Sequence, residues 1–194
     1  MKKALIIIDV QNDYFPNGKS ELFQSEEVLE KIIQILKYFR KNGFPVYYIK
    51  HISKKEGAGF FLPNTKGAEI HEKIRPLSKE KVIVKHFHNS FFKTELHKEL
   101  QKDSINELVI CGMMTHMCVD TTVRAGKDLG YNIILIEDGC TTKGLEWNGM
   151  QICAEAVQNV YMSSLNNKFA KVMKLDGYWG NFCQTEQFYG IDKE

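Results

Sequence analysis

No apolar run in this chain approaches the roughly 18 residues that a helix needs to cross a bilayer. The first apolar run, which begins at Ala4, is interrupted by the carboxylate of Asp9 too early for a secretory signal peptide. We therefore expect a cytoplasmic protein that has no membrane partner.

The chain also lacks a marked excess of charge of either sign. The 194 residues include 26 lysines and arginines against 24 aspartates and glutamates, and no segment forms a dense basic block. Proteins that bind nucleic acid or anionic membranes through charge usually carry such a block. The balance predicts no nucleic-acid partner and favours a small-molecule substrate.

The chain also lacks a Cys-x-x-Cys pair, an internal repeat, a low-complexity tract and a domain linker. Its cysteines are odd in number, and we expect free thiols because a reducing compartment disfavours disulfides. They are Cys111, Cys118, Cys140, Cys153 and Cys183. A chain of 194 residues can bury one core but is short for two, so we expect a single domain over residues 1–194.

Six short apolar segments predict strands that are covered on both faces, as in a parallel sheet. They are Ala4–Ile8, Val46–Ile49, Val82–Val84, Leu108–Cys111, Ile133–Ile136 and Ala170–Leu175. Four segments with helical spacing of apolar residues lie between them, at residues 28–39, 96–100, 119–129 and 152–165. This alternation predicts an α/β fold, a single-domain, Rossmann-like three-layer sandwich with a six-stranded, mainly parallel sheet.

Two segments fall outside this alternation. Residues Ser53–Ser78 are polar and punctuated by Gly and Pro, so we expect a long excursion with one short helix that acts as a lid or an interface. The tail after Leu175 predicts docking on the core or on a neighbouring subunit, because it is rich in aromatic residues. These are Tyr178, Trp179, Phe182, Phe188 and Tyr189.

Three reactive side chains lie where predicted strands end, which is the edge at which open α/β sheets bind ligands. Asp9 closes the first strand, Lys85 closes the third, and Cys118 opens the helix after the fourth. Singly, they suit ordinary structural roles: a turn cap, a surface cation and a small buried hydrophobe. Together they are typical of an activated nucleophile, in which the helix N-terminus and the ammonium lower the pKa of the thiol.

Four stretches carry these residues in order: Leu5–Phe15, Lys85 with Asn89–Leu96, Cys111–Ala125 and, more weakly, Glu137–Thr142. They resemble the isochorismatase-like cysteine hydrolase superfamily, which includes nicotinamidases, N-carbamoylsarcosine amidases and ureidoacrylate amidases. The resemblance implies a catalytic triad of Asp9, Lys85 and Cys118 and a cis peptide bond between Met113 and Met114. It also implies an oxyanion hole made by the backbone N–H groups of Met114 and Cys118.

The reaction implied is attack of Cys118 on a carbonyl carbon, departure of ammonia or an amine, and hydrolysis of the resulting thioester. Asp9 takes the thiol proton and returns it to the leaving nitrogen, while Lys85 holds both charges. A branch of the superfamily that cleaves the vinyl ether of isochorismate lacks the nucleophilic cysteine. The presence of Cys118 therefore favours hydrolysis of an amide-type C–N bond over that reaction. We therefore predict a metal-independent cysteine amidohydrolase that acts on a small amide, ureido or imide compound.

The chain departs from the metal-dependent nicotinamidases after the second predicted strand. Their D-x-H-P-x-x-H type motif is matched here by His51 alone, and His86 and His88 lack a third ligand nearby. We therefore predict no metal and no other cofactor. Two alternatives stay open: a nicotinamidase with an atypical metal site, and a catalytically silent binding protein of the same fold.

Position relative to the triad predicts the substrate-binding residues Gln11, Tyr14, Phe15 and Phe91, with Met114 also facing the pocket. Aromatic residues there suit a small, partly apolar substrate, although each of them also suits the core. The resemblance implies a homo-oligomer, either a dimer or a tetramer.

Overall fold

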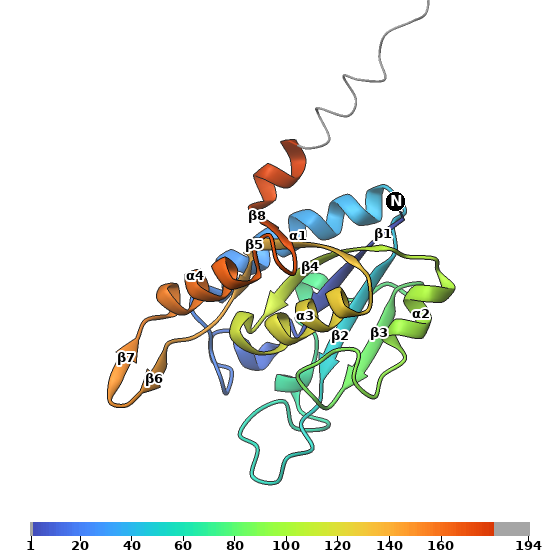
Figure 1. Ribbon diagram of the computed structural model, residues 1–194. Coiled ribbons are helices and arrows are strands. Elements are labelled where there is room, and N and C mark those ends of the chain that lie inside the picture. Colours follow the sequence, from blue (N-terminus) through green and yellow to red (C-terminus); the bar gives the residue numbers. More distant parts are fainter. Residues whose placement is uncertain (1, 181–194) are drawn as a thin grey trace, which may run out of the picture.

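The computed structural model describes residues 2–180. Six parallel strands form the centre of the protein (Figure 1). The strands are β1 (Lys3–Ile8), β2 (Val46–His51), β3 (Lys81–Lys85), β4 (Glu107–Met113), β5 (Asn132–Thr141) and β8 (Lys171–Met173). They lie in the order β3-β2-β1-β4-β5-β8, and each pair of neighbours runs parallel. The predicted α/β class and the six-stranded sheet are confirmed.

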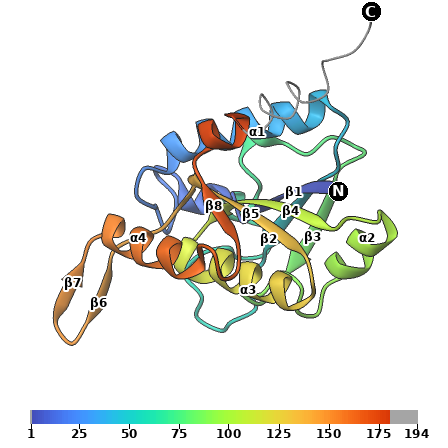
Figure 2. The ribbon, with the colours of Figure 1, turned by 45° about the horizontal axis from the view of Figure 1, so that its top comes forward.

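Four helices cover the two faces of this sheet: α1 (Ser25–Lys41), α2 (Leu96–Lys102), α3 (Asp120–Asp128) and α4 (Ala154–Leu165). Helix α1 packs on one face, and the other three pack on the opposite face (Figure 2). Strand β1 shows why both faces are covered. Its Leu5 and Ile7 pack on the α1 side, whereas Ile6 and Ile8 pack on the other side, so every position from Ala4 to Ile8 is apolar.

The direction of strand addition reverses between β1 and β4. The chain adds β2 and β3 on one side of β1, and it adds β5 and β8 beyond β4 on the other side. At such a switch point the carboxyl ends of the strands leave a crevice that binds ligands. The two strands approach closely here, since a Cβ on Gly112, whose φ is +129°, would lie 2.1 Å from the carbonyl oxygen of Ile8.

The chain between β5 and α4 forms a hairpin that the sequence analysis missed. Strands β6 (Leu145–Trp147) and β7 (Met150–Ile152) pair antiparallel and project from the body of the protein (Figure 1). Because Ile152 pairs with Leu145 in this hairpin, α4 begins at Ala154 rather than at the predicted residue 152. Strand β8 is likewise shorter than predicted, since residues 175–180 are already helical.

The excursion at residues 53–78 contains two 3-10 turns, η2 (Lys66–Ala68) and η3 (Glu72–Ile74), where we had expected one short helix. Asp13, in the 3-10 turn η1 (Asn12–Tyr14), anchors it. The Asp13 carboxylate accepts a hydrogen bond of 2.7 Å from the Phe61 N–H, and it lies so close to Gly67 that an added Cβ would meet it at 2.1 Å. The excursion is therefore fixed against the loop that follows β1.

The start of the aromatic tail packs on α1. The rings of Trp179 and Tyr38 lie 4.9 Å apart between centroids, and Tyr178 is buried. Phe182, Phe188 and Tyr189 lie outside the described residues. Within residues 2–180, no helix combines the length and the apolar character needed to span a membrane. The single domain, the homo-oligomer and the cytoplasmic location stay predictions.

Candidate active site

The three predicted reactive residues come from three different elements. Asp9 follows β1 with a φ of +51°, a left-handed conformation that is uncommon outside glycine, and its side chain is fully buried. Lys85 is the last residue of β3. Cys118 lies in a π-helical turn, η4 (Thr115–Val119), and not in the first turn of the α-helix as predicted, because α3 begins at Asp120.

The side chain of Lys85 brings these residues together. Strand β2 separates β3 from β1, so Lys85 reaches across the end of β2. Its Nζ lies 2.7 Å from Oδ2 of Asp9 and 3.1 Å from Sγ of Cys118. It also lies 3.0 Å from Nδ1 of His51 and donates to the carbonyl oxygen of Phe87 at 3.2 Å. The ammonium is thus surrounded by four acceptors.

The charges around Cys118 keep its proton on the sulfur. Burial raises the pKa of the Cys118 thiol, the Asp9 carboxylate raises it further, and the opposing effect of Lys85 is smaller. This direction corrects the sequence analysis, which weighed the helix N-terminus and the ammonium but not burial or the carboxylate. Burial lowers the pKa of Lys85, yet Asp9 and Cys118 outweigh burial and raise it, so the ammonium stays charged.

His51 is a site residue whose role sequence reasoning missed. It is the last residue of β2, the strand whose end the Lys85 side chain crosses, and its Nδ1 accepts a hydrogen bond from Lys85 Nζ. Gln11 holds its backbone from both sides, because Nε2 donates to the His51 carbonyl at 2.8 Å and Oε1 accepts from the His51 N–H at 2.7 Å. Burial and the charge of Lys85 lower the pKa of His51 to about 4, so the imidazole is neutral near pH 7.

This lowered pKa predicts a loss of stability in acid. Between pH 6.5 and about pH 4 the unfolded chain binds a proton at His51 that the folded protein does not bind, so the free energy of unfolding falls as the pH falls. We expect a loss on the order of 2 kcal/mol, allowing for the partial exposure of the ring. Urea unfolding of the native protein and of His51→Gln at several pH values measures it. A stability difference between the two proteins that does not change with pH would contradict the assignment.

A cavity of about 490 Å³ opens beside Cys118. Its wall includes four aromatic side chains, those of Tyr14, Phe60, Phe61 and Phe87, together with Met114 and Met117. Its polar lining consists of histidines, lysines and one serine, namely His51, His86, His88, Lys54, Lys55 and Ser53. The cavity therefore combines an apolar wall with neutral or basic polar groups, and the excursion at residues 53–78 supplies much of it.

The structure brings only part of the predicted substrate-binding set to this cavity. Tyr14 and Met114 line it, but Gln11, Phe15 and Phe91 do not. The side-chain amide of Gln11 is fully buried and bonded to the backbone of His51 and Ala68.

The two phenylalanines are turned elsewhere. Phe15 packs on His71, with ring centroids 4.4 Å apart, and Phe91 stacks on Tyr131 at 6.0 Å. Neither ring lines the cavity beside Cys118; Phe15 belongs to one hydrophobic core cluster, and Phe91 packs against the other.

The turn between β4 and Cys118 borders the same cavity. The peptide bond between Met113 and Met114 is cis. The Met114 carbonyl accepts hydrogen bonds from the N–H groups of Met117 at 3.1 Å and Val119 at 3.2 Å, which closes the turn around the nucleophile position. The oxyanion hole of the Met114 and Cys118 N–H groups stays a prediction.

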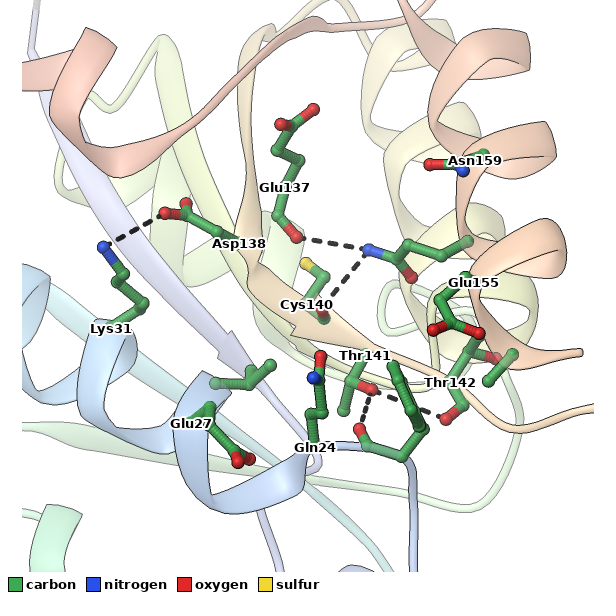
Figure 3. Close-up of a pocket in the computed structure, with 14 residues that line it drawn as sticks. Gln24, Glu27, Lys31, Glu137, Asp138, Cys140, Thr141, Thr142, Glu155 and Asn159 are labelled. Atoms are coloured by element: carbon green, nitrogen blue, oxygen red, sulfur yellow. Dashed lines mark hydrogen bonds and ion pairs between the residues drawn. The ribbon is translucent and has the colours of Figure 1, made fainter.

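A second cavity, of about 340 Å³, lies between α1, the end of β5 and α4 (Figure 3). Lys31 and Asp138 form an ion pair of 3.4 Å at its edge, and the Gln158 amide donates to the carbonyl oxygens of Glu137 and Cys140. Cys140 differs from Cys118 in its surroundings. Burial raises the pKa of its thiol to about 12, and no ammonium of the described residues contacts it. Cys140 is a buried structural thiol.

The comparisons with known proteins agree with this fold. The sequence profile of the Isochorismatase domain matches residues 3–175, so the chain belongs to the isochorismatase family of hydrolases. It is similar to YddQ, an isochorismatase family protein of Bacillus subtilis, with 46% identity over 178 residues that cover 92% of this chain and 99% of YddQ.

A solved structure and a relative with a named activity extend the match. The structure of an isochorismatase hydrolase from Oleispira antarctica superposes with a TM-score of 0.88 at 41% identity, covering 91% of this chain and 95% of that chain. Streptothricin hydrolase of Streptomyces noursei is 30% identical over 142 residues, which are 72% of this chain and 50% of that protein.

Proposed function

We propose that this protein is a metal-independent cysteine amidohydrolase that cleaves a C–N bond of a small amide, ureido or imide compound through a thioester on Cys118. The observation that carries the proposal is the contact of Lys85 Nζ with both the Asp9 carboxylate and the Cys118 thiol inside a buried site. Membership of a hydrolase family and similarity to streptothricin hydrolase, whose name specifies hydrolysis, support it.

The first step is the attack of Cys118 on the substrate carbonyl carbon. Because the thiol is protonated at rest, its proton must leave as the sulfur attacks, and Asp9 accepts it. The second oxygen of Asp9, Oδ1, is buried and has no hydrogen-bond partner among residues 2–180, so it is available for this proton. The developing oxyanion is stabilised by the N–H groups of Met114 and Cys118.

The second half of the reaction reverses the proton transfer. Asp9 gives the proton to the leaving nitrogen, which departs as ammonia or an amine while the carbonyl stays on the sulfur as a thioester. Water then attacks the thioester, Asp9 takes a proton from that water, and the acid product and the Cys118 thiol are released. Throughout these steps Lys85 keeps a positive charge between the carboxylate and the sulfur.

The cavity favours a neutral or anionic substrate. No carboxylate of the described residues lines it, whereas Lys54 and Lys55 do, and both lysine side chains are exposed. A cationic substrate would meet like charges at these positions without an opposite charge to pair with. Ureido acids and amides that carry a carboxylate fit this lining, as do small uncharged amides and cyclic imides.

A substrate panel tests the proposal. Nicotinamide, N-carbamoylsarcosine, ureidoacrylate, streptothricin and cyclic imides are incubated with the native protein, and loss of the compound and release of ammonia are measured. We expect turnover of at least one amide, ureido or imide compound without added metal. If a panel member stabilises the protein against heat but none is hydrolysed, the protein is instead a silent binding protein, and the proposal fails.

A further inference from the structure

We propose that Asp9, His51 and Cys118 also form a binding site for a thiophilic divalent metal ion, such as Zn²⁺, which the ammonium of Lys85 keeps closed. Ligand atoms of these three residues all lie within 4.8 Å of one another, and no other such group occurs within residues 2–180. The inference concerns the same site as the proposed function but does not depend on it, since metal binding is measured without a substrate.

The ligand set suits zinc and its chemical relatives. It offers a carboxylate oxygen, an imidazole nitrogen and a thiolate sulfur, which are the ligand types that Zn²⁺ uses in tetrahedral sites. His88 is placed to complete the set, because its Nδ1 lies 3.6 Å from Sγ of Cys118. The three central ligands come from the end of β2, the residue after β1 and the turn η4, which are positions held by the sheet.

Lys85 fills the place that a metal ion would take. Its Nζ lies 2.7 Å, 3.0 Å and 3.1 Å from the carboxylate, imidazole and thiol atoms of the same three residues. Bonds to zinc are shorter, about 2.0 to 2.3 Å, so the ligands would have to move inward by less than about 1 Å. The ammonium and the metal ion cannot occupy this position together, so an ion enters only if the Lys85 side chain leaves.

Charge arithmetic explains why the native protein holds the lysine. The resting site pairs one negative charge on Asp9 with one positive charge on Lys85, and the thiol is neutral. A divalent ion with the Asp9 carboxylate and a Cys118 thiolate is also neutral, but it leaves the Lys85 ammonium to be accommodated nearby. Replacing Lys85 by methionine removes this competitor and leaves a buried carboxylate without a partner, which favours the metal.

The consequence for the proposed reaction is inhibition rather than catalysis. A bound ion would coordinate the sulfur that attacks the substrate and the carboxylate that accepts the proton, so neither group could take part in the reaction. The site also differs from the D-x-H-P-x-x-H type of nicotinamidase site, because Asp9 and Cys118 lie outside the stretch that follows β2. Lys85 therefore acts both as the cation of the triad and as the group that excludes thiophilic metal ions.

Cobalt titration without oxygen tests the proposal. Co²⁺ replaces Zn²⁺ as the probe because a cobalt–thiolate bond gives an absorption band. Cys153 and Cys183 are changed to serine, whereas Cys111 and Cys140 are kept because both are buried. We expect Lys85→Met to bind one Co²⁺ at least about 100-fold more tightly than the native site, with the thiolate band and release of one proton per ion.

Two further variants assign the ligands. Added to Lys85→Met, Cys118→Ser should abolish the band, and His51→Ala should weaken binding by about tenfold or more. Lys85→Arg retains a cation and should bind as weakly as the native protein.

Two results would overturn the proposal: Lys85→Met that binds no more tightly than the native site, or a band that survives Cys118→Ser. If Lys85→Met does not fold, Lys85→Gln is titrated in its place, and binding no tighter than at the native site, or a band that persists when Cys118→Ser is added, has the same meaning. Because absorption is the readout, failure here is distinguishable from failure of the amidohydrolase proposal.

Discussion

Cys118→Ala should abolish hydrolysis, with kcat lowered by at least about 10⁴-fold. The proposed reaction needs a sulfur atom that bonds to the carbonyl carbon, and an alanine methyl group cannot form that bond. The fold should persist, since the substitution removes one buried atom near a cavity that the substrate fills. The measurement is the steady-state rate on the best compound of the panel, with far-ultraviolet circular dichroism as the check of folding.

Cys140→Ala is the matched control for this variant. Cys140 is also buried and also free, but it lies beside the second cavity, away from Lys85 and Asp9. Its loss should cost some stability through the cavity that it leaves and should keep kcat close to the native value. Equal activity of Cys118→Ala and the native protein would remove Cys118 from the mechanism.

Asp9→Asn should change two properties in opposite directions. Hydrolysis should fall by about 10²- to 10⁴-fold, because asparagine cannot accept the thiol proton or return it to the leaving nitrogen. Alkylation of Cys118 by iodoacetamide should become faster near pH 7. Asp9 raises the pKa of the thiol, so its neutralisation lets Lys85 lower that pKa and increases the thiolate fraction.

The pair of readouts separates a catalytic base from a residue that only maintains the fold. A merely structural loss would slow hydrolysis without shifting the pH dependence of alkylation at Cys118. Asp138→Asn serves as the control, since this residue pairs with Lys31 on the edge of the second cavity. If Asp9→Asn retains native turnover, or alkylates no faster than the native protein, Asp9 does not hold the proton as proposed.

The sheet could be predicted because its strands are continuous apolar runs. Strand β1, for example, is buried on both faces, and such a strand needs no alternation of polar residues to be recognised. The hairpin of β6 and β7 escaped because each of its strands is only three residues long and largely exposed. Its turn at Asn148 and Gly149, both with positive φ, carries the recognisable hairpin signal.

The members of the candidate site could be predicted, but their electrostatic balance could not. The sequence order shows that Asp9, Lys85 and Cys118 lie at or just after the ends of strands. The burial of all three side chains, which raises the pKa of Cys118, depends on the packing of the complete fold. The contact of Lys85 with His51 depends in turn on the lysine side chain crossing the end of β2.

The sequence also could not show which way the side chains of the predicted substrate-binding residues point. Tyr14 and Phe15 are neighbours in sequence, yet Tyr14 lines the cavity beside Cys118 and Phe15 packs on His71. Proximity along the chain places the backbone of a loop, but it does not decide which way each ring turns. The role of Asp13 as the anchor of residues 53–78 was missed for the same reason, because its partner Phe61 is distant in sequence.

The central claim is that the substrate carbonyl is transferred to Cys118, and hydroxylamine trapping tests it most directly. Hydroxylamine attacks a thioester at its carbonyl carbon, displaces the Cys118 thiol and gives a hydroxamate in place of the acid. On a hydrolysed primary amide, the account predicts that hydroxylamine diverts product from acid to hydroxamate without slowing ammonia release, and that Cys118→Ala makes neither product. Ammonia release with no hydroxamate at any hydroxylamine concentration would mean that water attacks the substrate directly, and it would contradict the account.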